Sequence, residues 1–457
     1  MFNPKIYQKR RAKLASELKT GFVLLLGHQN SPMNFSHNTY PFIQDTNFLY
    51  YVGVDLPHCA CLIDIEKNKT IFYMLEKTIH DIIWIGQTKT INQWGENTGA
   101  DEIKNIAALK NDVKNIKNMM YPPQFRADNK IYIHELLAIS LNEVEKQSSP
   151  SLINAIIKQR SIKENEEISE IKSALDITNE MHLKAMTSSE AGKYEYEVVA
   201  EMEKIIKSKS AALAYPIIFS RDGQILHNAN YNNKILEGDL LLNDSGANSK
   251  LHYASDITRT FPANGKFSTK QKEIYCIVQE MQEVVLSQLK EGVSFKEMHK
   301  LSAYIGIKRL KELGLLKGSI DEGLEKGVYG LFYPHGLGHM LGLDVHDMES
   351  LGEDIVGYSK AIKREAEFGI TFLRLGKELE SGFCITVEPG IYFIPELFAQ
   401  WKKEQRFSHL INYNEFKNYL DFGGIRIEDN ILINKNGSEN LSAFIPKKIS
   451  DIENIMS

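Results

Sequence analysis

Cysteine is scarce in this chain: four residues, Cys59, Cys61, Cys276 and Cys384, occur among 457. Cys59 and Cys61 are separated by one residue and not by the two of zinc and redox motifs, so reduced, buried thiols are expected. Long apolar runs are also lacking. The longest near the N-terminus, Phe22–Leu26, is too short for a signal peptide or for the roughly 20 residues that span a bilayer. We therefore expect a cytoplasmic protein with no membrane partner.

An excess of positive charge is lacking too. The 54 Lys and Arg residues are balanced by 59 Asp and Glu residues, which gives a net charge of −5. A chain of this charge gains nothing from counterion release on DNA, so no nucleic-acid partner is expected. The content of 43% hydrophobic and 25% charged residues is typical of a globular protein, and the length indicates two or three domains.

The first part of the chain has the pattern of a mixed α/β domain. A serine-rich break at 148–151 and a charged segment at 160–167 precede a long helical pattern that reaches Ser188. We therefore place an N-terminal α/β domain at residues 1–158. Short apolar runs predict its strands at 22–26, 48–52, 60–65, 71–74 and 131–133.

The second part, residues 159–457, has the pattern of an α+β domain. Ser268 and Ser294 are each followed three residues later by Gln or Glu, a spacing that predicts capped helix starts. The two helices are expected to end near Gly292 and Gly314. Strand patterns lie around them at 240–243, 253–261, 384–387 and 425–433. Hairpin-paired strands with helices outside predict an α+β fold.

Two aspartates stand at the base of a predicted hairpin. Asp244 ends one strand, a turn-rich segment follows, and Asp256 precedes the next strand. Two adjacent carboxylates repel each other unless one is protonated or a cation lies between them. Two unrelated surface aspartates would explain the pattern equally well when it is taken alone.

Three histidines, His335, His339 and His346, fall within twelve residues of a glycine-rich segment. Such clustering favours metal binding or acid–base chemistry over three separate core histidines. Glu388 ends an apolar strand at a Pro-Gly turn, and Arg426 and Glu428 alternate along another strand. The four carboxylates Asp244, Asp256, Glu388 and Glu428 would balance the charge of two divalent cations.

These segments, in this order, resemble the pita-bread metallopeptidases, among them methionine aminopeptidase, prolidase and aminopeptidase P. The matching words are Ala254–Pro262, His335–His339, Val387–Gly390 and Gly424–Glu428. The N-terminal part is similar to the non-metal domain of aminopeptidase P and prolidase, most clearly at Asn47–Gly53, and methionine aminopeptidases lack this domain. Some relatives carry a pocket aspartate where this chain has Asn47, so Asn47 is not assigned to the site.

The resemblance implies two divalent metal ions, most simply Mn²⁺, with Zn²⁺, Co²⁺ or Fe²⁺ as alternatives. It also implies a bridging water that attacks the bond between the N-terminal residue and a proline. The family's ligands carry over to Asp244, Asp256, His339, Glu388 and Glu428. The spacing of twelve between the two aspartates is one more than the family usually shows. We keep Asp244 as the ligand because Ser245 offers no carboxylate.

By the same resemblance, Glu388 moves the proton and His346 donates to the developing oxyanion. His335 shapes the pocket for the residue after the scissile bond, His227 lies near the entrance, and Arg426 orients the carboxylates. The family also implies peptide substrates with proline second and a homodimer or homotetramer.

Three functions compete. An Xaa-Pro aminopeptidase is expected first, a prolidase restricted to Xaa-Pro dipeptides second, and a non-catalytic binding protein on the same fold third. Non-catalytic members have lost their metal ligands, whereas all five positions are filled here.

Overall fold

The computed structural model describes residues 1–86 and 89–457, which divide into two compact units. One unit holds Met1–Arg160 and the short segment Glu349–Gly352. The other holds Ser161–Met348 and Glu353–Ser457. Within the described residues, no helix combines the length and the apolar character that crossing a bilayer requires.

The first unit is built on a five-stranded sheet with the order β6-β5-β4-β1-β7. The central pairs β1–β4 and β4–β5 are antiparallel, whereas the outer pairs β5–β6 and β1–β7 are parallel. Alternate apolar side chains of β1 and β4 pack into one buried core. The strands are β1 (Phe22–Leu26), β4 (Cys59–Asp64), β5 (Lys69–Met74), β6 (Glu102–Asn105) and β7 (Met119–Met120), with a separate hairpin of β2 (Pro32–Phe35) and β3 (Asn38–Thr39).

Two predicted strands of this unit are helical. Residues 48–52 belong to α2 (Thr46–Val52), because the Asp45 side chain caps the helix start and Gly53 ends it in a left-handed conformation. Residues 131–133 lie inside α6 (Ala127–Leu137). Both runs were too short for their periodicity to separate a buried helix from a strand. The other helices are α1 (Pro4–Leu18), α3 (Ile79–Ile85), α4 (Ile91–Thr98), α5 (Leu109–Val113), α7 (Leu141–Val144) and α8 (Pro150–Ser161).

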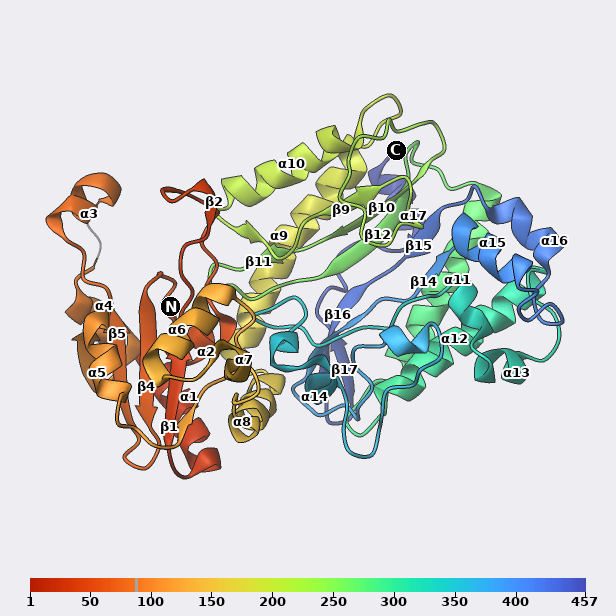
Figure 1. The fold of residues 1–457 in the computed structure, drawn as a ribbon. Coiled ribbons are helices and arrows are strands. Elements are labelled where there is room, and N and C mark those ends of the chain that lie inside the picture. The colour runs from red at the N-terminus through yellow and green to blue at the C-terminus, as the bar shows by residue number, and fades with distance from the viewer. Residues whose placement is uncertain (87–88) are drawn as a thin grey trace. The chain divides into compact units, whose positions relative to one another are not determined.

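The second unit carries its strands between two groups of helices (Figure 1). Its sheets have the orders β12-β10-β9, β13-β16-β17, β14-β15 and β11-β8. The strands are β8 (Ala212–Leu213), β9 (Ile218–Ser220), β10 (Leu240–Ser245), β11 (Ala247–Asn248), β12 (Ile257–Pro262), β13 (Cys384–Val387), β14 (Gly390–Tyr392), β15 (Gly424–Arg426), β16 (Asp429–Asn434) and β17 (Gly437–Asn440).

The two capped helices of this unit begin where the sequence predicts, although the first of them ends at Leu286 and not near Gly292. In α11 (Thr269–Leu286) both hydrogen bonds of the Ser268–Gln271 capping box form, and Ser294 accepts a hydrogen bond from the Glu297 N–H at the start of α12 (Phe295–Glu312). The remaining helices are α9 (Asn165–Ser188), α10 (Glu195–Ser208), α13 (Ile320–Glu325), α14 (Glu353–Gly357), α15 (Pro395–Lys403), α16 (Tyr413–Phe416) and α17 (Ile449–Ile455).

The predicted strand at 425–433 is interrupted. β15 ends at Arg426 and β16 begins at Asp429, so Glu428 lies in a short gap between two strands. Its N–H donates to the Thr258 carbonyl of β12 at 3.1 Å. This bond brings Glu428 beside the strand that follows Asp256, although the two residues are 172 positions apart in the sequence.

Candidate metal centre

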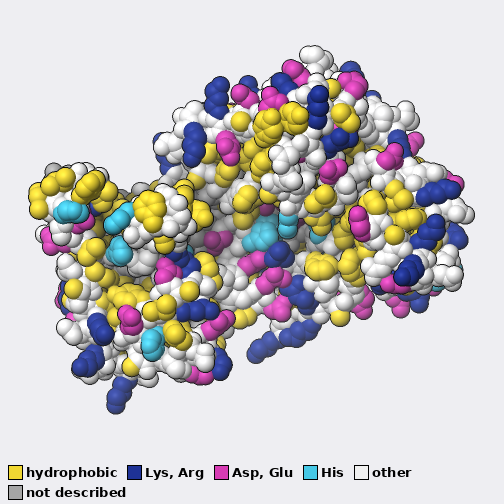
Figure 2. Space-filling view, turned by 45° about the horizontal axis from the view of Figure 1, so that its top comes forward, with side chains coloured by type: hydrophobic (Ala, Val, Ile, Leu, Met, Phe, Trp, Pro, Cys, Tyr) yellow, Lys and Arg dark blue, Asp and Glu magenta, His cyan; other side chains and the backbone are white. Residues whose placement is uncertain are grey.

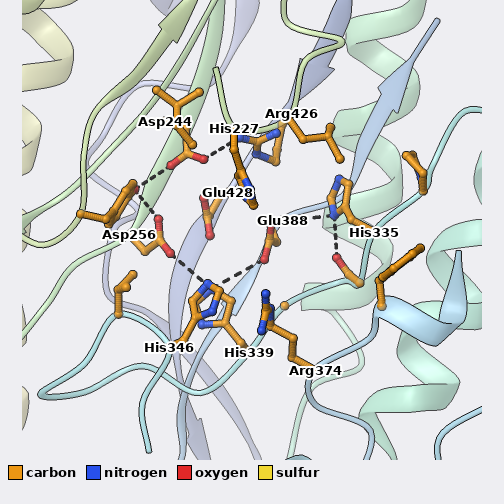
Figure 3. A pocket seen from close by; sticks show the side chains of 18 of the residues that line it. His227, Asp244, Asp256, His335, His339, His346, Arg374, Glu388, Arg426 and Glu428 are labelled. Atoms are coloured by element: carbon orange, nitrogen blue, oxygen red, sulfur yellow. Dashed lines mark hydrogen bonds and ion pairs between the residues drawn. The ribbon is translucent and has the colours of Figure 1, made fainter. Parts of the chain in front are cut away.

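A pocket of about 960 Å³ opens in the second unit. All nine residues that the sequence singles out for the site line it (Figure 3). In the space-filling view, histidine side chains gather beside acidic ones in a hollow near the middle of the picture (Figure 2). The nine residues are His227, Asp244, Asp256, His335, His339, His346, Glu388, Arg426 and Glu428.

The register of the β10–β12 hairpin decides which side chains face this pocket. Asp244 pairs with Thr258, and Asp256 stands two residues before Thr258 on the neighbouring chain segment. Diagonal neighbours of this kind project from the same face of a sheet. Ser245 faces the other way, where its hydroxyl lies 3.3 Å from Nε2 of the buried His182. The structure thus presents Asp244, and not Ser245, to the pocket.

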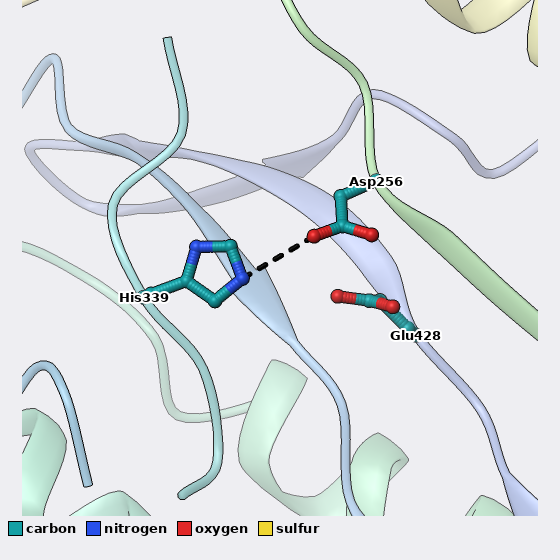
Figure 4. A group of neighbouring side chains, drawn as sticks. All are labelled: Asp256, His339 and Glu428. Atoms are coloured by element: carbon teal, nitrogen blue, oxygen red, sulfur yellow. Dashed lines mark ion pairs between the residues drawn. The ribbon is translucent and has the colours of Figure 1, made fainter. Parts of the chain in front are cut away.

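Three side chains form the tightest group in the pocket. One ligand atom each from Asp256, His339 and Glu428 lies within 4.8 Å of the other two (Figure 4). His339 Nε2 is 3.3 Å from an Asp256 oxygen, and His339 Nδ1 lies 3.0 Å from the Met340 carbonyl. The carbonyl can only accept, so Nδ1 carries a proton and Nε2 is directed at the carboxylates.

The other two carboxylates lie around this group. Glu388 has an oxygen 3.7 Å from His339 Nε2. Asp244 is paired with the Arg426 guanidinium, and the Tyr215 hydroxyl lies within hydrogen-bond distance of both Asp244 and Asp256. The structure therefore gathers all five predicted ligands in one cavity, with three of them at the closest spacing.

Burial changes the protonation of these carboxylates. It raises the pKa of Glu388 to about 7 and raises the pKa of Glu428 and Asp244, with repulsion from neighbouring carboxylates adding to the shift. For Asp256 burial acts in the same direction, but the hydrogen bond and charge of His339 outweigh it and lower the pKa. Without a cation, ionisation of these clustered carboxylates is unfavourable. Divalent cations would stabilise their charged form, because the positive charge would offset the repulsion between them.

The remaining histidines surround the metal ligands. The rings of His346 and His339 have centroids 4.1 Å apart. Both nitrogens of His335 are engaged, Nδ1 with the Gly336 carbonyl at 2.8 Å and Nε2 with the Tyr392 hydroxyl at 2.9 Å. The carbonyl can only accept, so Nδ1 donates, and the two contacts fix the orientation of the ring. Burial lowers the pKa of His335 to about 3, so the ring is neutral near pH 7 and Nε2 can accept from the Tyr392 hydroxyl.

Several residues in or beside the pocket were not assigned to the site from the sequence. The Tyr392 hydroxyl accepts a hydrogen bond from Arg426 at 2.8 Å and so connects Arg426 to His335. Tyr392 stands two residues after the matched segment Val387–Gly390, and no motif includes Tyr215, because its contacts arise only on folding. Arg374 lines the pocket, and its guanidinium donates to Glu353 at 2.8 Å. Apolar walls come from β9, from α15 and from the segments between the strands and helices, with Ile218, Leu226, Phe368, Phe372, Ile394 and Leu397.

Comparison with known proteins agrees with this geometry. A model of metallopeptidase family M24 matches residues 169–435, and a model of the aminopeptidase P N-terminal domain matches residues 7–121. The chain therefore belongs to metallopeptidase family M24. The second match places it with aminopeptidase P within that family, which confirms both the resemblance of its motifs and the pita-bread fold with an added N-terminal domain.

Individual relatives cover nearly the whole chain. A probable Xaa-Pro aminopeptidase of Fusarium vanettenii is 35% identical over 91% of this chain and 88% of its own length. One of Colletotrichum graminicola is 33% identical over 96% and 92%. Zinc-substituted Escherichia coli aminopeptidase P in complex with product superposes with a TM-score of 0.82 at 27% identity, covering 100% of this chain and 98% of that one.

Proposed function

We propose that this protein is a dinuclear metal aminopeptidase that hydrolyses the N-terminal Xaa-Pro bond of peptides. The observation that carries the proposal is the convergence of four carboxylates and one directed imidazole on the floor of a pocket with apolar walls. Membership of family M24 and similarity to proteins named Xaa-Pro aminopeptidase support it. The domain division at residue 158 and a cytoplasmic location remain part of this proposal.

Five residues would hold the metal ions. They are Asp244, Asp256, His339, Glu388 and Glu428, and Mn²⁺ would suit this mainly oxygen donor set. When bound, the ions supply an activated water and a polarised scissile carbonyl. The remaining catalytic roles belong to the side chains that surround the metal ions.

The position of each side chain in the pocket indicates its role in the reaction. Glu388, at the pocket floor near His339, takes the proton of the attacking water and delivers it to the proline nitrogen. His346, whose ring lies against His339, donates a hydrogen bond to the oxygen that becomes negative. Arg426 holds Asp244 in place through their ion pair.

Two further histidines act on the substrate. The fixed, neutral ring of His335 forms a wall for the proline, since both of its nitrogens are already engaged. His227 lies between β9 and β10 at the exposed side of the pocket and contacts the substrate at the entrance. Substrates with proline second need such a dedicated pocket, because proline has no N–H for the backbone contacts of general proteases.

The size of the pocket favours an aminopeptidase over a prolidase. A volume of about 960 Å³ is near the upper end of small-ligand sites and leaves room beyond a dipeptide. Arg374 is the basic residue of this pocket best placed to capture a dipeptide carboxylate, but Glu353 already neutralises it. We therefore expect peptides of three or more residues to be accepted, with a homodimer or homotetramer as the active form.

Product analysis tests the proposal. Manganese-loaded protein is incubated with Gly-Pro and, separately, with a Xaa-Pro-Xaa tripeptide, and the products are identified by mass spectrometry. The N-terminal residue should be released from the tripeptide at least as efficiently as from the dipeptide. An intact tripeptide beside a cleaved dipeptide means a prolidase, and two intact peptides mean that the enzymatic proposal is wrong.

A further inference from the structure

The loop that joins His339 to His346 is anchored by an ion pair that the mechanism above does not use. Lys163 Nζ lies 2.8 Å from an Asp347 oxygen, and the two side chains are only 1% and 2% exposed. Asp347 directly follows His346, whereas Lys163 lies 184 residues away, just before α9. We propose that Lys163 is a positioning residue for His346 and acts through Asp347.

The loop is closed at both ends by backbone hydrogen bonds. The Asp347 N–H donates to the Met340 carbonyl at 2.9 Å, and the Leu341 N–H donates to Cys384 of β13 at 2.9 Å. The Gly342 carbonyl accepts from Ala254, two residues before Asp256, at 2.8 Å. The loop therefore contacts Cys384 of β13, the strand that leads to Glu388, and Ala254 just before Asp256, and His346 emerges at its last turn.

The Asp347 carboxylate fills the centre of this loop. One of its oxygens accepts from the Asp344 N–H at 3.3 Å, and the other binds Lys163. A Cβ atom at Gly342 would lie 2.4 Å from that second oxygen, so glycine is the residue that lets the loop fold this closely around the carboxylate. A buried carboxylate is stable in such a place only while a cation compensates its charge.

Lys163 is itself held in place by its neighbours in the chain and by a backbone hydrogen bond. The Lys163 N–H donates to the Gly382 carbonyl at 2.8 Å, and the next residue, Glu164, begins the capping box of the 24-residue α9. Removing the ammonium would take away the positive charge 2.8 Å from the buried Asp347 carboxylate, which would then move toward water. Because His346 is covalently joined to Asp347, its ring would then lose its position against His339 (Figure 3).

The inference rests on the proposed function, in which His346 stabilises the transition state. A cycle of Lys163→Met, His346→Ala and the double variant tests it with an Xaa-Pro-Xaa peptide. Lys163→Met should lower kcat by about 10-fold to 100-fold, with KM within about threefold and bound metal retained. In the His346→Ala background the same substitution should cost less than about twofold, because the group that it positions is gone.

A purely structural role for Lys163 predicts equal losses in both backgrounds, and that result would overturn the inference while leaving the proposed function intact. Unaltered activity of Lys163→Met would also overturn the inference and leave the proposed function intact. Wild-type protein that does not cleave the peptide overturns both. If Lys163→Met does not fold, Asp347→Asn enters the same cycle. The matched control is Lys377→Met, which removes a partly buried lysine of this unit and should leave kcat unchanged.

Discussion

Each carboxylate of the pocket is placed by contacts with side chains far away in the sequence. Thr258 donates to Glu428 at 2.7 Å, and the Asp256 N–H donates to the Asn430 side chain at 3.1 Å. These two bonds fasten β12 to the segment that carries Glu428. The Asp256 bond, and the Glu428 N–H bond to the Thr258 carbonyl, use backbone groups of these two residues, so substitution of either carboxylate removes a ligand while these links between the strands remain.

Glu428→Ala and Asp256→Ala should both abolish turnover. Each substitution removes one of four negative charges and one of the five metal-binding side chains, so we expect less bound metal per chain and a loss of activity of roughly 10³-fold or more. Metal analysis together with peptide hydrolysis measures both effects. Glu396→Ala, which removes an exposed pocket carboxylate outside the cluster, is the control. Wild-type activity within tenfold of normal in metal-free buffer would contradict a dinuclear centre.

Asp244 and Ser245 offer a second comparison of single residues. Asp244→Ala should lose at least one metal ion per chain, because its carboxylate faces the pocket. Ser245→Ala should keep the full metal content, because the hydroxyl faces His182. Metal stoichiometry after dialysis measures the difference, and the opposite order would show that the ligand has been misassigned.

At this scale the sequence marked the residues that stand in recognisable motifs and missed those that act through contacts made on folding. The clustered histidines and the carboxylates at strand ends carry a local signal. The hydroxyl of Tyr215 reaches Asp256 across 41 residues, and no local pattern around Tyr215 predicts that contact.

At the scale of elements, the β10–β12 hairpin holds the first two carboxylates. Gly246 lies in this hairpin opposite Asp256, and a Cβ atom there would meet the Ser255 carbonyl oxygen at 1.8 Å. Backbone atoms cannot move aside as a flexible side chain does. The hairpin therefore depends on this glycine for its shape and not only for its turn.

Gly246→Ala should destabilise the second unit by at least about 2 kcal/mol and reduce metal binding, because the two strands must separate to admit the methyl group. Urea unfolding and metal titration measure the two effects. Gly437→Ala is the matched control, since a Cβ atom at this turn meets nothing within 4 Å. Equal stability of the two variants would show that the hairpin adapts freely.

Prediction of the elements from sequence succeeded where the signal was long or capped, as for α9, α11 and α12. It failed at α2, where residues 48–52 are buried on all sides, so that no alternation of polar and apolar residues distinguishes a helix from a strand. The break at Ile427 and Glu428 also escaped prediction, because neighbouring strands determine it.

At the scale of the whole molecule, buried neutral histidines make stability depend on pH. Burial lowers the pKa of His299 from 6.5 to about 3, and neither ring nitrogen has a hydrogen-bond partner among the described residues. Below pH 6.5 the unfolded chain binds a proton at this residue, whereas the folded chain does not until about pH 3. The unfolded state binds more protons in this interval, so the free energy of unfolding decreases as the pH falls.

His299→Phe should remove this part of the acid sensitivity. At pH 5 the wild-type residue costs about 2 kcal/mol relative to neutral pH, and the variant should recover that amount while being no less stable at pH 7.5. Phenylalanine fits the surrounding Tyr329 and Tyr333 rings. Urea unfolding at both pH values measures the change, with the exposed His37→Phe as control. An unchanged pH slope in His299→Phe would contradict the assignment.

The spacing between Asp244 and Asp256 has a consequence for finding relatives of this protein. The strand register continues without a shift from Leu240 opposite Pro262 to Asn248 opposite Ala254, and the chain then reverses at the tip, where His252 has a positive φ. An added residue at this tip lengthens the written motif but leaves both carboxylates on the same face of the hairpin. A sequence motif that requires a fixed number of residues between the two aspartates will miss chains like this one. A motif that is defined by the residues that pair across the hairpin will find them.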